Sequence, residues 1–291
     1  MRYEAPESLE GAVALLAGAT GEARVLAGGT DLLVQMRADI VDPELIVDIK
    51  KIAETRAVTL EQGGWRIGAA VTGAELKEHA RLKQAWPGVV EAANLIGSTQ
   101  VQGRATLGGN LCNGSPAADS VPALIAAGAV AALAGPGGQR DLPVEDIMLG
   151  PRKLALRRGE IVVSFLLPPR PSRSSDAYLR FIPRTEMDIA VVGAGVSVTV
   201  DGAGTITAAR VSLGAVAARV LLVPEAAQAI VGSRLEVAAQ QRLEAAARRR
   251  TRAGTRISSR SRSCRFRSWR TVSRRAPERP RRRKSRRCGR R

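Results

Sequence analysis

Two pairs of adjacent glycines occupy positions at which a backbone could grip an anion. The first pair, Gly28 and Gly29, ends a short strand pattern at residues 24–27 and precedes Thr30 and Asp31, which are typical helix caps. Glycine reaches positive φ and has no side chain, so several N–H groups can point at one phosphate beside the following helix. The same pattern is also a common structural turn, so this loop taken alone does not establish a site.

The second pair, Gly108 and Gly109, lies in a longer polar segment, residues 106–119, which also contains Asn110 and Asp119. This segment offers backbone donors for phosphate and a carboxylate for sugar hydroxyls, which is the complement that a dinucleotide requires. Two phosphate-sized loops fit a pyrophosphate. Neither loop is a Walker A motif, because the lysine is missing, and neither has the GxGxxG spacing of a Rossmann unit.

The other residues that could do chemistry are few. Cys112, Cys264 and Cys288 show no CxxC or Cys/His spacing, which argues against a disulfide framework, a zinc site or a resident iron–sulfur cluster. We therefore expect no metal site and no catalytic residue of the chain itself. His79, the single histidine, is expected to be a solvated surface residue. A protein of this kind would depend on a cofactor for its chemistry.

The composition suits a globular protein of two or three compact units, since 291 residues with 45% hydrophobic content can bury a core. The longest apolar run, residues 121–133, is shorter than the roughly 20 residues that cross a bilayer. We expect no secretory signal, because the N-terminus has no basic stretch followed by an apolar one. We expect no membrane span and a cytoplasmic location.

The formal charge of +18 comes from one end of the chain. Residues 248–291 hold 21 of the 45 Lys and Arg residues and one of the 27 acidic residues, which leaves 24 basic and 26 acidic residues in the remainder. An Arg-rich arm could bind RNA or an acidic partner. We favour the alternative that the segment is an out-of-frame translation of a GC-rich gene, because the composition breaks abruptly. Either way, this tail, residues 248–291, gives no evidence about the rest of the chain, for which we expect no nucleic-acid binding.

Hydrophobic periodicity predicts an alternation of helices and strands followed by an antiparallel meander. Helices are expected at residues 9–16, 32–36, 72–79, 86–96, 122–127, 225–232 and 235–248. Strands are expected at residues 24–27, 43–49, 57–60, 65–69, 129–134, 160–167, 177–184, 190–200 and 206–215, with a linker at residues 168–175 and a short element at residues 144–147.

Four segments in order carry a specific family resemblance. They are AGGTDLL (residues 27–33), TLGGNLCNGSPAADS (106–120), EIVVS (160–164) and RFIPRTEMDIA (180–190). Over residues 3–247 the chain resembles the FAD-binding medium subunit of the molybdenum hydroxylases, the family that includes carbon-monoxide dehydrogenase and a domain of xanthine dehydrogenase. The tail departs from the family, whose members usually close with a short turn and a helix.

The resemblance implies an α+β fold: a two-part FAD-binding domain of the vanillyl-alcohol-oxidase (PCMH) type and then a small antiparallel-sheet plus helix domain. The implied units are residues 1–55, 56–170 and 176–247, with the tail after them. The implied cofactor is FAD. The residues that would contact it are Val25, Leu26, Ala27, Gly28, Gly29, Thr30, Asp31, Leu32, Ile96, Thr106, Gly108, Gly109, Asn110, Asp119, Val162 and Arg180.

Within this set, the first loop and the residues from Thr106 to Asn110 would line the pyrophosphate, and Asp119 would hold the ribityl or adenosine end. Arg180 stands where the family often has lysine, and either residue would place positive charge near the flavin. Read without the resemblance, Ile96 and Val162 are core residues. Arg184 and Asp188 stand four residues apart in the sequence, at the spacing of a structural ion pair.

By resemblance, the chain takes electrons from an iron–sulfur small subunit, which receives them from a molybdenum-cofactor large subunit, and passes them from FAD to an external acceptor. A hetero-oligomer is therefore expected. Two alternatives stay open at this point. One is a stand-alone flavin reductase of the same fold, which would need a proton donor and a substrate-binding acid; the other is RNA binding through the tail.

Overall fold

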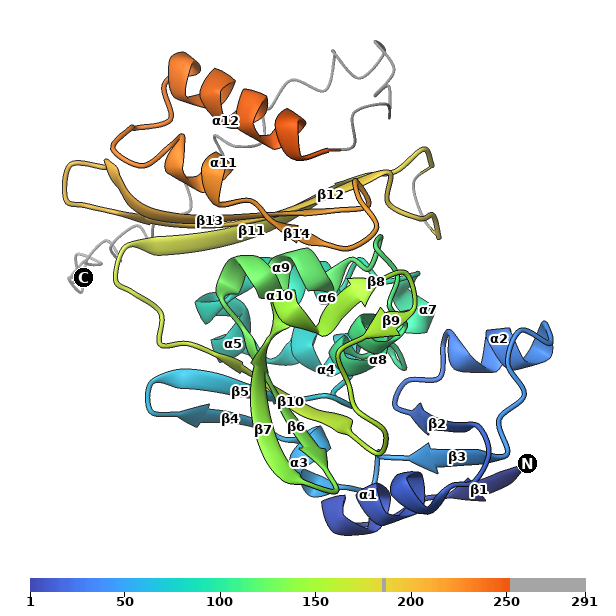
Figure 1. The fold of residues 1–291 in the computed structure, drawn as a ribbon. Coiled ribbons are helices and arrows are strands. Elements are labelled where there is room, and N and C mark those ends of the chain that lie inside the picture. Colours follow the sequence, from blue (N-terminus) through green and yellow to red (C-terminus); the bar gives the residue numbers. More distant parts are fainter. Residues whose placement is uncertain (185–186, 252–291) are drawn as a thin grey trace, which may run out of the picture.

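The N-terminal part of the protein is a small parallel sheet with one helix packed on it (Figure 1). The computed structural model describes residues 1–184 and 187–251. Strands β1 (Arg2–Glu4), β3 (Leu45–Asp48) and β2 (Ala23–Leu26) pair in that order, all parallel. Helix α1 (Leu9–Gly18) begins at Ser8, whose hydroxyl accepts a hydrogen bond from the Gly11 N–H at 3.1 Å, as the sequence predicts. The short helix α2 (Leu32–Arg37) follows β2 and buries none of its residues.

The second part is a five-stranded antiparallel sheet with a layer of short helices on one face. The strands pair in the order β4 (Val58–Glu61), β5 (Gly64–Gly68), β10 (Ile161–Leu167), β6 (Val130–Gly135) and β7 (Gly138–Pro143). The helices of this layer are α4 (Gly73–Glu78), α5 (Ala80–Ala85), α6 (Pro87–Ala93), α7 (Thr99–Gln102), α8 (Leu107–Cys112), α9 (Ser120–Ala127) and α10 (Val144–Ile147), whereas α3 (Ala53–Arg56) lies apart from it, near α1 (Figure 1). A small hairpin joins β8 (Met148–Gly150) to β9 (Lys153–Leu154).

Two local predictions in this part need correction. The helix expected at residues 86–96 ends at Ala93, with Asn94 as its C-cap. His79 is half-buried rather than solvated: it caps α5 by accepting a hydrogen bond from the Leu82 N–H at 3.2 Å, and its ring meets the Trp65 ring edge-on, with centroids 5.1 Å apart. Sequence periodicity does not show this, because the contact with Trp65 depends on how the start of α5 meets strand β5.

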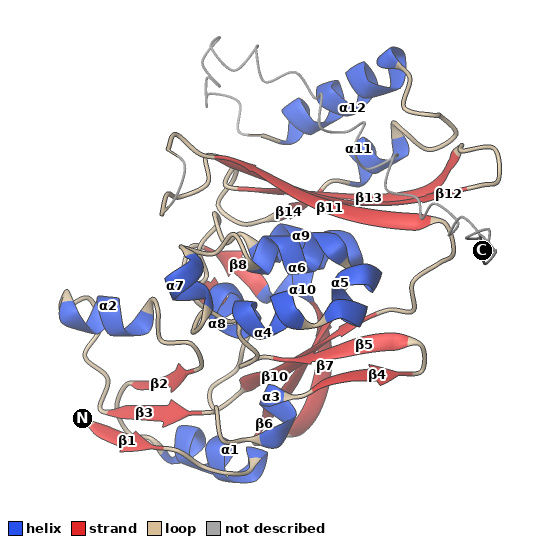
Figure 2. Cartoon of the chain, turned by 180° about the vertical axis from the view of Figure 1, so that it is seen from behind, coloured by secondary structure: helices blue, strands red, loops and turns tan. Residues whose placement is uncertain are grey.

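The third part is the predicted antiparallel meander, in the order β11 (Ser174–Phe181), β12 (Val192–Val200), β13 (Ile206–Gly214) and β14 (Leu221–Leu222). Helices α11 (Pro224–Gln228) and α12 (Val237–Arg250) cover its outer face, as Figure 2 shows from behind. The helix predicted at residues 235–248 thus ends two residues later than expected, at Arg250, and includes the first three residues of the tail. The rest of the tail, residues 252–291, lies outside the described residues.

The helical layer is held between the two antiparallel sheets (Figure 1). Its helices α6 and α9 pack on β11, β12 and β13, and a large core of buried apolar side chains joins this layer to the five-stranded sheet. Gly195 of β12 makes the approach of α9 possible, because a Cβ there would lie 2.9 Å from the Ala123 nitrogen. In the described part of the chain, no helix has both the length and the apolar character needed to cross a membrane.

Candidate functional site

The first glycine loop leaves a row of backbone donors without partners. It follows β2, and Gly29 has φ of 79°, in the left-handed region that favours glycine. Among the described residues, none accepts a hydrogen bond from the N–H groups of Gly28, Gly29, Thr30 and Asp31. Residues 28–31 are half-buried or exposed, so a ligand can reach this loop from solvent. Four consecutive free donors at the carboxyl end of a parallel strand therefore form a ready receptor for an anion.

The second loop works differently from the prediction. Thr106 caps α8 by accepting a hydrogen bond from the Gly109 N–H at 2.9 Å. The Gly108 N–H donates to the Ala69 carbonyl at 3.1 Å, and the Asn110 N–H to the Thr106 carbonyl at 3.0 Å. These donors are used inside the protein, so the expectation that the second pair supplies N–H groups to phosphate is wrong. Its glycines provide clearance instead, since a Cβ on Gly108 would lie 2.6 Å from the Ala69 carbonyl oxygen.

The two loops lie side by side, as the sequence predicts for one cradle. A Cβ on Gly109 would stand 3.9 Å from the Gly28 nitrogen, and a Cβ on Gly28 would collide with the Arg104 carbonyl. A side-chain bond also crosses between them, because Gln35 of α2 donates to the Asn113 side-chain oxygen at 2.9 Å. The loops are 80 residues apart in the sequence, so the fold brings the free donors of one against the bare backbone of the other.

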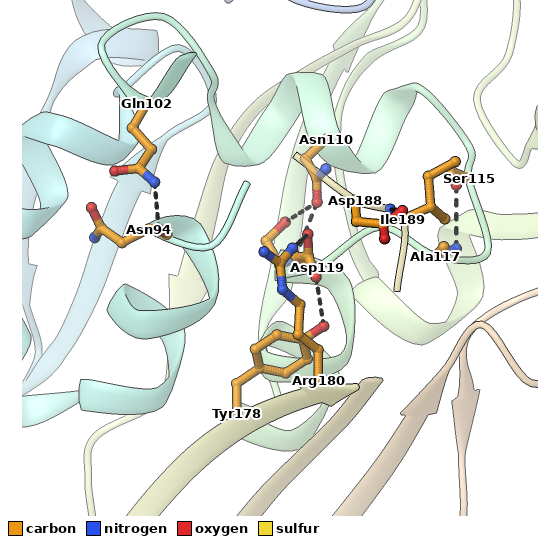
Figure 3. A network of polar contacts seen from close by, with 11 residues as sticks. Asn94, Gln102, Asn110, Ser115, Ala117, Asp119, Tyr178, Arg180, Asp188 and Ile189 are labelled. Atoms are coloured by element: carbon orange, nitrogen blue, oxygen red, sulfur yellow. Dashed lines mark hydrogen bonds and ion pairs between the residues drawn. The ribbon is translucent and has the colours of Figure 1, made fainter. Parts of the chain in front are cut away.

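A buried polar network closes one end of the site (Figure 3). Asp119, at the start of α9, accepts hydrogen bonds from the Tyr178 hydroxyl and from the Arg180 guanidinium, both at 2.8 Å. Asn110 accepts from the Ser120 N–H at 3.1 Å and from its hydroxyl at 2.7 Å. Burial raises the pKa of Asp119, and its bonds to Tyr178 and Arg180 pull it back down. The pKa of Tyr178 is raised by burial and by the neighbouring carboxylate.

This network sharpens two predictions. Both oxygens of Asp119 already have a protein partner, and each retains a second lone pair that a ligand hydroxyl could use. The guanidinium of Arg180 is 7% exposed and balanced by Asp119, so its charge is not free to act on a flavin in the way the sequence suggested. Asp119 and Arg180 lie together as partners of each other.

The other residues predicted to contact the cofactor differ in how exposed they are. Val25 and Asp31 are exposed, whereas Leu26, Leu32 and Ile96 are half-buried. Ala27 and Val162 are buried, and the Val162 side chain belongs to the core under the helical layer, so only its backbone could reach a ligand. Arg184 and Asp188 do form the ion pair expected from their spacing, at 3.3 Å.

Several residues of the site escaped the sequence analysis. Tyr178 is the clearest, and a signal existed: it stands two residues before Arg180, so both side chains leave the same face of β11. Gly193 on the paired strand gives the Tyr178 hydroxyl its room, because a Cβ there would lie 2.7 Å from that oxygen. No local pattern marked Gln35 or Arg104.

A cavity of about 450 Å³ borders the paired loops. Ala27 and Thr106, which precede the two glycine pairs, form part of its wall. The charged residues in its lining are Lys50, Arg56, Glu75 and Arg104. In residues 1–184 and 187–251, no group of three His, Cys, Asp or Glu side chains is placed to hold a metal ion.

These features define the class of protein, which is an α+β protein with a site for a dinucleotide between two subdomains. The free donors, the glycine clearance and the cavity fit such a ligand. Residues 1–170 match the model of the FAD-binding domain in molybdopterin dehydrogenase, and residues 177–271 match that of the carbon-monoxide dehydrogenase flavoprotein C-terminal domain. The chain belongs to this FAD-binding family of molybdopterin dehydrogenases, which confirms the predicted family, fold class and cofactor.

Relatives of known identity agree. The chain is 35% identical over 217 residues to the xanthine dehydrogenase FAD-binding subunit of Escherichia coli O157:H7, covering 74% of each chain. It is 30% identical over 243 residues to the nicotinate dehydrogenase FAD-subunit of Eubacterium barkeri, covering 82% of each. Among solved structures, carbon monoxide dehydrogenase from Hydrogenophaga pseudoflava, in a form lacking the Mo-pyranopterin moiety, matches with a TM-score of 0.82 at 32% identity over 87% of each chain.

Proposed function

We propose that this chain is the FAD-binding electron-transfer subunit of a molybdenum-cofactor dehydrogenase. It would receive electrons from an iron–sulfur small subunit, supplied by a molybdenum-cofactor large subunit, and pass them to an external acceptor. The observation that carries the proposal is the meeting of the two glycine loops, where the four unpaired N–H groups of residues 28–31 lie beside Gly109. The family match and the names of the relatives, which are FAD subunits of dehydrogenases, support it.

The chain's own residues bind and orient, while bound FAD supplies the electron chemistry. The first loop would hold the pyrophosphate through its N–H groups, and the second would let it approach closely. Asp119 and Arg180, fixed by Tyr178, would form the wall at the flavin end. The proposed contacts are Val25, Leu26, Ala27, Gly28, Gly29, Thr30, Asp31, Leu32, Ile96, Thr106, Gly108, Gly109, Asn110, Asp119, Val162 and Arg180, with units at residues 1–55, 56–170 and 176–247.

The proposed assembly is a hetero-oligomer in the cytoplasm. Its support is that similar proteins are named as subunits or chains of larger dehydrogenases, including a medium chain of carbon monoxide dehydrogenase. A stand-alone flavin reductase is not favoured, because the family models and the named relatives match FAD subunits of larger dehydrogenases.

The test is to purify the chain alone and with the subunits encoded beside it. We expect flavin absorption bands from the chain alone and release of FAD, not FMN, on denaturation. We also expect a tagged chain to recover an iron–sulfur and a molybdenum subunit in fixed ratio. A colourless protein that takes up no added FAD would refute the cofactor assignment, and a coloured protein that stays alone would refute the assembly.

A further inference from the structure

A buried ion pair lies where the chain enters the C-terminal sheet. Arg170, in the segment between β10 and β11, donates to the Asp176 carboxylate at 2.6 Å, and the two side chains are 15% and 3% exposed. The guanidinium also lies over the Trp86 ring, 4.5 Å from its centroid, and donates to the Ala85 carbonyl. Because Ala85 and Trp86 belong to the helical layer, the ion pair joins that layer to the C-terminal sheet.

Each member of this pair caps one of two successive helices. Helices α5 and α6 are separated by Trp86 alone. The last carbonyls of one helix and the first N–H groups of the next have no partner within their own helix, and an indole accepts no hydrogen bond. Asp176 caps α6 by accepting a hydrogen bond from the Val89 N–H at 3.1 Å, and Arg170 caps the carbonyl that ends α5. Both charges also have the sign that the helix dipoles favour.

Strand β11 approaches this helix junction closely. A Cβ on Gly88 would lie 2.6 Å from an Asp176 carboxylate oxygen and 2.7 Å from the Ala177 nitrogen, so a larger residue would push the strand away. Burial raises the pKa of Asp176, whereas the positive charge of Arg170 and the N–H groups of α6 lower it. Without Arg170, the carboxylate would be a buried charge with no counter-ion, which is destabilising. The ion pair therefore holds β11 at one position on α6.

The same face of β11 reaches the proposed site. Asp176, Tyr178 and Arg180 alternate along the strand, and the last two donate to Asp119 at 2.8 Å. Tyr178 lies two residues from Asp176, about 7 Å along an extended strand. A shift of β11 on α6 would therefore move the Tyr178 hydroxyl and the Arg180 guanidinium away from Asp119. Hydrogen bonds are short and directional, so a shift of roughly 1 Å is enough to break them.

We propose that Arg170 and Asp176 are positioning residues of the flavin site, which anchor β11 so that Asp119 keeps one orientation toward the cofactor. The inference rests on the proposed function, since Asp119 faces the proposed FAD site. It gives two residues outside the glycine loops and the cavity a part in that site, through Tyr178 and Arg180. Loss of the ion pair should therefore change how the flavin is held, as well as how stable the protein is.

The experiment compares Arg170→Gln with Arg140→Gln in the full-length chain. Arg140→Gln is the matched control, because it removes an arginine from another carboxylate, that of Glu160, whose side chain is 7% exposed in a different part of the protein. Both variants should lower Tm. Only Arg170→Gln should weaken FAD binding, by about tenfold in fluorescence titration of the apoprotein, the loss of roughly one charge-assisted hydrogen bond to the ligand. Only Arg170→Gln should change the visible circular dichroism of the bound flavin.

Two further variants separate the charge from the packing. Arg170→Lys retains the charge but not the flat contact with Trp86, so it should recover part of the lost affinity. Asp176→Asn should weaken FAD binding as Arg170→Gln does, and the two substitutions together should have less effect than their sum, because the neutral pair leaves no buried charge. In the apoprotein, hydrogen exchange of the β11 amides should be faster in Arg170→Gln and unchanged in Arg140→Gln.

If Arg170→Gln lowered Tm but kept wild-type FAD affinity and flavin dichroism, the ion pair would serve stability alone, and this inference would be overturned while the proposed function stood. Should Arg170→Gln not fold, Arg170→Lys carries the same comparison, and unchanged affinity and dichroism in that variant would also overturn the inference. A wild-type chain that takes up no FAD would refute the proposed function, whereas faster exchange of β11 in Arg170→Gln would still support the anchoring of the strand.

Discussion

Substituting Gly28→Ala tests whether the contact between the two loops makes the site. The new Cβ would collide with the Arg104 carbonyl oxygen and stand 3.0 Å from the Arg104 carbonyl carbon and 3.2 Å from the Ala105 Cα. All three neighbours are backbone, so no flexible side chain can move aside. Restoring ordinary contact requires the loops to separate by about 1 Å.

The cost can be estimated from overpacking. Forcing a methyl group into packed backbone destabilises a protein by about 1–3 kcal/mol, which lowers Tm by roughly 2–12 °C in a chain of this size. Separation of the loops also spreads the N–H groups of residues 28–31 away from Gly109. We expect FAD affinity to fall at least tenfold, about 1.4 kcal/mol, in fluorescence titration of the apoprotein.

Gly18→Ala is the matched control for this substitution. Gly18 ends α1, its new Cβ would meet no atom within 4 Å, and alanine favours helix. We expect Tm to stay the same or rise slightly and FAD affinity to be unchanged. If Gly28→Ala kept both its Tm and its FAD affinity, the loops would not be in the contact described, and the account of the cradle would be wrong.

Three further outcomes are expected. Asp119→Asn leaves the Arg180 guanidinium buried without a counter-charge and should cost about 3 kcal/mol in urea unfolding, and adding Arg180→Gln should recover part of the loss. Arg140 lowers the pKa of Glu160 below its ordinary 4.5. The loss of thermal stability caused by Glu160→Gln should therefore be complete above pH 4.5 and should vanish as the pH falls through the folded-state pKa. Thermal unfolding from about pH 3 to pH 7, in steps of roughly one unit, measures this loss. Burial raises the pKa of the half-buried Cys112 thiol to about 12, so iodoacetamide should label its peptide much more slowly in the folded protein than after unfolding, as read by mass spectrometry.

The sequence predicts best those features whose signals lie within a few residues of one another. The glycine pairs and the Ser8 cap are written within a few residues, and each is found where it was expected. The alternation of the meander is also local, but its first strand begins at Ser174, inside the predicted linker and three residues before the predicted start. The pairing of the two loops came from the family resemblance, because no spacing within either loop specifies a partner 80 residues away. The boundary of the helix at Ala93 was missed for a related reason: Gln102 donates to the Asn94 carbonyl, and that contact comes from a later turn of the chain.

The roles of the site residues were less predictable than their positions. The number of donors in the second loop was overestimated, since the Gly108 N–H is taken by Ala69 and the Gly109 N–H by Thr106. Sequence shows which groups could donate and not which already have acceptors.

The C-terminal sheet contributes to the site through one strand. Alternation along β11 sends Asp176, Tyr178 and Arg180 to the same face, toward the helical layer. Asp176 accepts a hydrogen bond from the Val89 N–H at 3.1 Å, and the other two bind Asp119. Apolar packing alone would let the sheet slide on the helices, whereas buried hydrogen bonds hold only in one register, because unpaired polar groups there are costly. The same bonds that orient the third part of the protein therefore build the wall at the flavin end, which makes the position of Asp119 depend on residues some 60 positions later in the chain.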